Sequence, residues 1–352
     1  MALFEFSLIY LVPLSVVMGY YLGGYYTFIT PLFVFGVVPV LDILIGRDIR
    51  NPSEETEKIW DRQIGFRALT WICAPLQVAA VFWGAYILRH SSLNFIEITG
   101  FVFSIGISSG VLGINVAHEL SHRVNEKFEP FLGKSMLWTV FYMHWGLEHV
   151  VGHHRNVATP EDPATARLAE SFYQFWPRTV FGSFNSAWEF EKNRLLKSGE
   201  SVWSLKNRLV LFSIEQVVLI VLFAFFFGFI GIFFLFIQSF IAITLLEVIN
   251  YIEHYGLIRR REKDGKYEAV KPWHSWNSSN RLTNRFLFNL QRHSDHHYKP
   301  NRRYQMLRHH EESPQLPTGY AGMVLVALIP PLWRFIMDKR VKAFHIRDGE
   351  RF

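Results

Sequence analysis

The sequence has very little cysteine: a single residue, Cys73, stands inside an apolar stretch of the 352-residue chain. One thiol excludes a disulfide framework, a paired-cysteine zinc site and a four-cysteine iron site within the chain. Its surroundings predict a small buried hydrophobe in a helix. The chain also has no dinucleotide-binding glycine fingerprint. Any electrons that its chemistry consumes must therefore come from another protein.

Charged residues are almost absent from several long stretches, although half of all residues are hydrophobic and 33 are phenylalanine. A helix that crosses a bilayer needs about 20 mostly apolar residues. The sequence therefore predicts an all-α polytopic membrane protein with six transmembrane helices near residues 7–24, 27–46, 68–88, 95–117, 209–227 and 232–252. Gly228 and Gly231 offer the turn that divides the last long run. The first run lacks a basic n-region, so we expect no cleavable signal peptide.

The basic residues are distributed unevenly between the loops. With both termini on the cytoplasmic side, 35 of the 36 lysines and arginines face the cytoplasm, and only Arg89 lies opposite. Cytoplasmic loops carry such an excess, so the net charge of +6 indicates orientation and no nucleic acid. The same topology predicts that the histidine-bearing segments 118–208 and 253–352 form a cytoplasmic cap. We expect the shorter apolar stretches 131–147 and 320–337 to be interfacial or packed against the bundle.

Nine histidines form four groups with metal-ligand spacing. His118 and His122 are four residues apart, so on a helix they share one face. His149 and His153 repeat this spacing, and His154 is placed to reach a second ion. Nine ligands exceed one site and predict two metal ions. The candidate ligands are His118, His122, His149, His153, His154, His254, His293, His296 and His297.

Carboxylates accompany the histidines, and two interpretations of them stay open. They can accept the free ring N–H of a ligand histidine and fix its orientation, or they can face water or pair with nearby arginines. The residues are Glu119, Glu148, Glu253 and Asp295. Glu247 lies two turns before His254 within the membrane zone. It is either functional or part of an interhelical hydrogen bond.

Three classes of function compete on spacing alone. His118, Glu119 and His122 satisfy the His-Glu-x-x-His pattern of a zinc protease, with Glu119 as general base. That interpretation leaves six histidines unused, whereas a two-metal oxygenase uses all nine. A metal transporter would need ligands along a transmembrane path, but here they gather at one membrane face. His254 is the weakest ligand candidate by spacing.

The surroundings of the four groups closely resemble the membrane alkane 1-monooxygenases, which are non-haem di-iron ω-hydroxylases of the desaturase and hydroxylase superfamily. The most specific blocks are Asn-Tyr-Ile-Glu-His-Tyr-Gly at 250–256 and Leu-Gln-Arg-His-Ser-Asp-His-His at 290–297. Ala-His-Glu-Leu-Ser-His-Arg at 117–123 and the block 148–164 add to them. The resemblance runs from about residue 30 to 340.

The resemblance implies a single membrane domain with two iron ions, held by all nine histidines, and no catalytic residue beyond them. The implied reaction is O2-dependent terminal hydroxylation of alkanes, with electrons from rubredoxin and its NAD(P)H-dependent reductase, in the bacterial inner membrane. Xylene monooxygenase hydroxylase subunits share part of the pattern, so aryl methyl groups are the alternative substrate.

Two further expectations concern substrate and partner. We expect Val34 and Phe35 on the second span to line a substrate channel and limit chain length, although they can equally face lipid. The basic runs 259–261 and 302–303 suit docking of an acidic electron donor, but they also serve the positive-inside bias.

Overall fold

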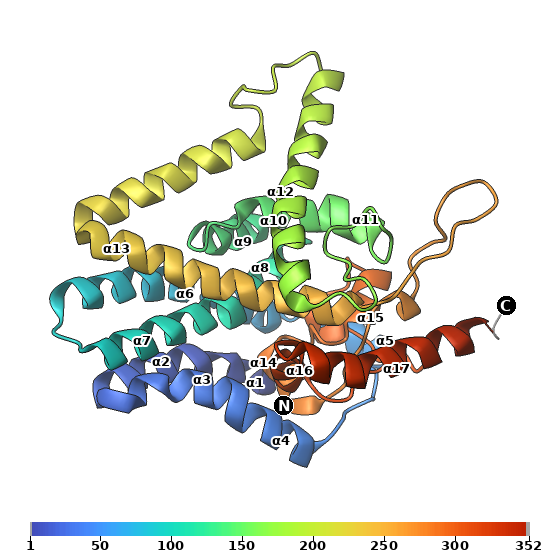
Figure 1. Cartoon of the computed structure of the whole chain (residues 1–352), viewed down its shortest axis with the longest axis horizontal. Coiled ribbons are helices and arrows are strands. Elements are labelled where there is room, and N and C mark those ends of the chain that lie inside the picture. The colour runs from blue at the N-terminus through green and yellow to red at the C-terminus, as the bar shows by residue number, and fades with distance from the viewer. Residues whose placement is uncertain (1, 350–352) are drawn as a thin grey trace.

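The computed structural model describes residues 2–349, and within that range the secondary structure is helical, with three isolated β-bridges and no strand (Figure 1). Five helical stretches are long and apolar enough to cross a membrane. The first two are Leu3–Leu22, which includes α2 (Leu11–Leu22), and Gly24–Ile45, which includes α3 (Ile29–Leu32) and α4 (Val38–Ile45). The next two are α6 (Ile64–His90) and Phe95–Ser121, which comprises α7 (Phe95–Ser108), a π-helical segment (Ser109–Ile114) and α8 (Asn115–Ser121).

The fifth stretch is α13 (Arg208–His254), which bends sharply at one point (Figure 1). Gly228 has φ 67° and ψ −160° there, a conformation that favours glycine. Each arm beside it has the roughly 20 residues that a bilayer requires. The two arms therefore correspond to the predicted spans 209–227 and 232–252. Gly231 lies within the second arm, so the break is at Gly228 alone.

Further helices lie outside these spans. They include α5 (Glu54–Arg62), α9 (Phe128–Trp138), α10 (Met143–Glu148), α12 (Phe172–Lys197), α14 (Arg281–Phe286) and α15 (His293–Tyr298). Near the C-terminus, α16 (Tyr320–Ala327) and α17 (Pro330–Gly349) meet at an angle of 119°. Met323 and Trp333 of this pair share a buried cluster with Tyr251 of α13. The pair therefore packs against the bundle.

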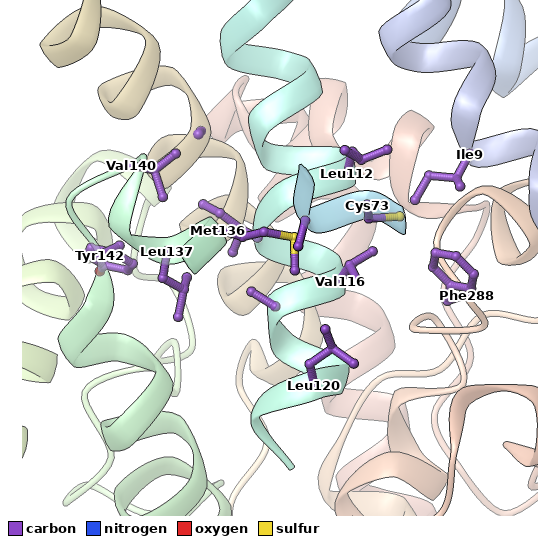
Figure 2. Close-up of a cluster of buried hydrophobic side chains, with 14 of the residues drawn as sticks. Ile9, Cys73, Leu112, Val116, Leu120, Met136, Leu137, Val140, Tyr142 and Phe288 are labelled. Atoms are coloured by element: carbon purple, nitrogen blue, oxygen red, sulfur yellow. The ribbon is translucent and has the colours of Figure 1, made fainter. Parts of the chain in front are cut away.

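A hydrophobic core joins the first span to the segment that leads toward the metal site (Figure 2). Ile9, Cys73 and Val116 lie in this core with Met136 of α9, and all are fully buried. Burial of Cys73 confirms its predicted role as a small hydrophobe. Because α8 is enclosed on this side, its opposite face is directed toward the histidines.

Farther into the bundle, a network of buried polar side chains fixes the π-helical segment that precedes α8. Gln77 of α6 donates to the Ser109 hydroxyl at 2.9 Å, and Ser109 donates to Gln238 of α13 at the same distance. Gln238 in turn donates to the Thr139 carbonyl. Polar groups in a membrane interior need such partners. The network ties three spans together at the π-helical turn that precedes α8.

Candidate metal centre

The nine predicted histidines converge at one end of the bundle, where α8, the C-terminal end of α13 and the short helices α11 (His154–Asn156) and α15 meet (Figure 1). Their ring nitrogens form two groups, and within each group the nitrogens lie within 4.8 Å of one another. One group contains His118, His122, His149, His154 and His296. The other contains His153, His254, His293 and His297. The chain therefore has two adjacent sites, each with enough imidazoles to hold a metal ion.

One detail of the predicted grouping is wrong. The spacing of His149 and His153 assigned them to one ion and His154 to another, but the structure places His149 with His154 and His153 in the other group. The cause is a π-helical segment at His149–His153. A π-helix closes its hydrogen bonds between residues five apart, so His149 and His154 come to share a face.

Distances between the ring nitrogens match the edges of a metal coordination shell. The Nε2 atom of His149 lies 3.1 Å from that of His122 and 3.0 Å from that of His154. His154 Nε2 is also 3.0 Å from His296 Nε2. Nitrogen ligands about 2.1 Å from a metal and at right angles to each other are roughly 3.0 Å apart. The first group therefore has the spacing of adjacent ligands on one ion.

Hydrogen bonding between the rings cannot replace the ion. A neutral imidazole nitrogen offers one proton or one lone pair, yet His149 Nε2 and His154 Nε2 each approach two other nitrogens. The buried Nε2 of His118 has no hydrogen-bond partner in the described structure. In the second group, Nε2 of His293 approaches that of His254 at 3.2 Å, and Nε2 of His153 approaches that of His297 at 3.2 Å. A metal ion in each group would satisfy these lone pairs.

The electrostatics favour neutral imidazoles, which is the form that binds metals. Burial lowers the pKa of His149 well below its ordinary value, and neighbouring histidines lower it further. The same causes lower the pKa of His122 and His296. His153 differs: burial acts to lower its pKa, but the Asp162 and Glu148 carboxylates outweigh burial and raise it.

Asp162 is the functional candidate that the sequence did not reveal. Its buried Oδ2 lies 2.9 Å from Nδ1 of His153, and it also accepts a 2.6 Å hydrogen bond from the Thr165 hydroxyl. Such a carboxylate fixes the tautomer of a histidine and directs its other nitrogen toward the metal. Asp162 stands in the block 148–164, but it is nine residues from His153, and only the intervening turns bring them together.

The predicted carboxylates occupy varied positions. Glu253 is the one of the five that reaches a predicted ligand: its Oε2 lies 3.1 Å from Nε2 of His293, while its Oε1 accepts from the Tyr320 hydroxyl at 2.8 Å. The contact is to Nε2 of His293, the ring nitrogen that faces the other histidines. The sequence predicted a contact to the other ring nitrogen, which points away from the metal site. Glu148 accepts from Ser186 at 3.1 Å, and burial, together with the Asp162 carboxylate, raises its pKa to about 8.

The other three predicted carboxylates have partners elsewhere. Glu119 accepts hydrogen bonds from the Arg123 guanidinium and, at 3.4 Å, from the Tyr304 backbone N–H. Asp295 pairs with Arg302 and with His310. Glu247 accepts hydrogen bonds from Tyr142, Thr179 and Asn250, at 2.7, 2.9 and 3.1 Å. For these three the interpretation as ion-pair or interhelical residues agrees with the described contacts.

The basic runs proposed for docking are largely occupied. Arg302 pairs with Asp295 at 2.6 Å, and Arg303 pairs with Glu126 and Glu129. Arg259 is buried and donates to backbone carbonyls of Glu268 and Arg155. These three arginines hold the cap together, whereas Arg260 and Arg261 of the first run are exposed.

A narrow apolar cavity of about 90 Å³ reaches the histidines from within the bundle. His118, His149 and His293 line its polar end. Val34 and Phe35 line it too, so they face a cavity and not lipid alone. From His118 the lining continues along the fourth span to Gly110, a distance of roughly 12 Å at 1.5 Å per residue. A slender apolar molecule in this cavity would point one end at the metal centre.

Comparisons with known proteins agree with this geometry. The family model of the fatty acid desaturases matches residues 94–326. Alkane 1-monooxygenase 2 of Pseudomonas aeruginosa is 43% identical over 91% of this chain and 84% of its own length. Alkane 1-monooxygenase 2 of Alcanivorax borkumensis is 41% identical over 97% of this chain and 92% of its own length. The xylene/toluene monooxygenase hydroxylase component of Pseudomonas putida is 26% identical over 94% and 87%.

Proposed function

The chain belongs to the alkane 1-monooxygenases of the fatty acid desaturase family, and on that premise we propose that its two histidine groups each bind one iron ion. The enzyme is a multi-pass membrane monooxygenase that hydroxylates alkanes at the terminal carbon. The balanced reaction is alkane + O2 + two electrons + two protons → 1-alkanol + water. When bound, the irons supply the O2 activation that an unreactive terminal C–H bond requires. The proposal rests on one observation: an apolar cavity ends at two adjacent histidine groups.

The residues of the chain position the reactants. The cavity accepts an alkane, excludes water and directs one terminal carbon toward His118, His149 and His293. Val34 and Phe35 limit the length of chain that fits. Asp162 holds the His153 ring in place, and Tyr320 holds the Glu253 carboxylate beside His293.

Electrons come from a separate protein, because the single cysteine and the absence of a dinucleotide fingerprint leave the chain without a redox relay of its own. The family resemblance implies rubredoxin and its NAD(P)H-dependent reductase as the donors. The family resemblance implies a location in the bacterial inner membrane, and the charge bias of the loops supports an orientation with both termini and the metal centre on the cytoplasmic side.

Glu119 argues against the zinc protease alternative. A general base needs a carboxylate that is free to take a proton from water, but Glu119 is held by Arg123 and the Tyr304 backbone. A protease would also leave one of the two histidine groups without a role.

Product analysis tests the proposed function. Membranes that contain the enzyme, a rubredoxin and its reductase are supplied with octane, hexadecane or xylene. We expect 1-alkanols from at least one alkane. Conversion of xylene alone would support the aryl methyl alternative, and no alcohol from any of the three would contradict the assignment of the reaction.

A further inference from the structure

A second pocket of about 300 Å³, separate from the histidine site, lies beside the segment that precedes His293. Four of the side chains that line it are the arginines Arg50, Arg281, Arg285 and Arg292, and two are the carboxylates Glu5 and Asp48. The pocket therefore carries a net charge of +2, from four positive and two negative groups. The catalytic proposal assigns it no role.

The two carboxylates form ion pairs with three of the arginines, so one positive charge among these three remains uncompensated. Glu5 pairs with Arg281 at 2.9 Å and with Arg285 at 2.7 Å. Asp48 pairs with Arg50 at 2.8 Å. Of the four arginines, Arg292 is the one that has no ion pair among the described residues.

Arg292 is deeply buried, at 7% exposure, and no ion pair forms with it in the described range. Its terminal nitrogens donate to the backbone carbonyls of Leu307 and Asp48, at 2.6 and 2.8 Å, and its Nε has no partner there. The Asp48 and Asp295 carboxylates attract this guanidinium but form no ion pair with it, and a buried charge without a contacting counter-charge is costly. The pocket therefore favours an anion next to this guanidinium.

Gln305 supplies a second, independent observation. Its side chain is 3% exposed and lines the pocket, yet neither its Nε2 nor its Oε1 has a hydrogen-bond partner in the described structure. Buried amides are almost always satisfied, so such an exception calls for an explanation. The Nε2 donors of Gln305 and the guanidinium of Arg292 are the groups that bind the oxygens of a tetrahedral oxyanion.

The position of the pocket indicates where the anion comes from. Glu5 stands near the start of the first span and Asp48 just beyond the end of the second, so both lie at the membrane face that carries the histidines. Lipid phosphates are at that depth. The side chain of Arg281 is 44% exposed and accessible from outside.

We propose that this pocket binds a phosphate group, carried either by the headgroup of a membrane phospholipid or by a free phosphate. Arginine and amide N–H groups bind phosphate oxygens, and the Nε of Arg292 and the Nε2 of Gln305 are donors without a partner in the described structure. Arg292 precedes His293 directly, so bound phosphate stabilises the segment that carries this histidine. The inference does not depend on the identity of the metal or the substrate.

Binding to the intact purified protein tests the proposal. The probes are inorganic phosphate, dihexanoyl phosphatidylglycerol and dihexanoyl glycerol, and the measurement is isothermal titration in a phosphate-free detergent buffer. We expect at least one phosphate-bearing probe to bind and dihexanoyl glycerol not to bind. Binding of the lipid alone identifies a headgroup as the source, and binding of inorganic phosphate alone identifies a free phosphate. Binding of neither overturns the proposal.

Two variants test whether the phosphate-bearing probe binds in this pocket. We expect Arg281→Gln and Gln305→Leu each to weaken the affinity about tenfold, as loss of a hydrogen bond to a charged group does. Arg208→Gln is the matched control, since Arg208 also pairs with a carboxylate and its side chain is also 44% exposed. Without probe, Gln305→Leu should unfold at the same or a higher temperature, because it removes unpaired buried polar atoms. Affinities equal to that of the control would overturn the proposal.

Discussion

Replacement of Asp162 by asparagine tests how the protein holds its metal ligands. In the structure, Oδ2 of Asp162 is 2.9 Å from Nδ1 of His153, and Oδ1 accepts the Ala164 backbone N–H at 3.0 Å. Asparagine keeps an acceptor for Ala164 but removes the negative charge that fixes His153. Loss of such a partner typically weakens metal affinity about 10- to 100-fold, which corresponds to about 1.4–2.7 kcal/mol.

Because His153 belongs to one histidine group, the Asp162→Asn variant should lose one of its two ions more readily. The assay is the iron content per chain over a titration with chelator. Thr165→Val is the matched control, since Thr165 contacts the same carboxylate oxygen but not His153. Iron retention equal to that of the wild type, or an equal loss in the control, would refute the role of Asp162.

Three further predictions address the channel, the bundle and the cap. Val34→Trp fills the cavity and should shift products toward shorter alkanols, whereas Val37→Trp, at an exposed position on the same span, should leave them unchanged in chromatographic analysis. Gly106→Ala places a Cβ 2.7 Å from the Cβ of Ile241, so it should cost about 1–3 kcal/mol and lower the melting temperature in detergent. Burial acts to raise the pKa of Glu191, but its hydrogen bonds with arginines outweigh burial and lower it to about 2. The wild type should therefore lose stability as the pH falls from about 4.5 towards 2, and Glu191→Gln should show a smaller loss over this window.

The long apolar helices and the clustering of the nine histidines could be predicted from the sequence because both depend on local patterns. Long apolar runs identify membrane helices whatever their partners, and Gly228 marked the bend in α13 correctly. The nine histidines were recognisable from spacing and flanking residues, and the structure brings all nine together. His254, weakest by spacing, completes the second group.

The division of the ligands between the two groups was not predictable in the same way. The spacing of His149, His153 and His154 was interpreted with α-helical geometry, whereas the chain forms a π-helical turn there. Nothing in the local composition marks that turn. Because of this turn, His154 shares a group with His149, and His153 belongs to the other group.

Long-range contacts were also beyond the sequence. Asp162 reaches His153 through the turns between them, and four of the five predicted carboxylates contact residues other than the predicted metal ligands, whereas Glu253 alone of the five contacts one. The cavity is built from several spans that are distant in the sequence. Only their packing shows that Val34 and the histidines share one space.

The metal content of the purified chain tests the central claim most directly. Iron and zinc per chain are measured by mass spectrometry after purification without chelator. The two histidine groups predict two metal ions per chain, and the proposed O2-dependent reaction predicts that both are iron, with no stoichiometric zinc. One zinc ion per chain with no iron would contradict the account.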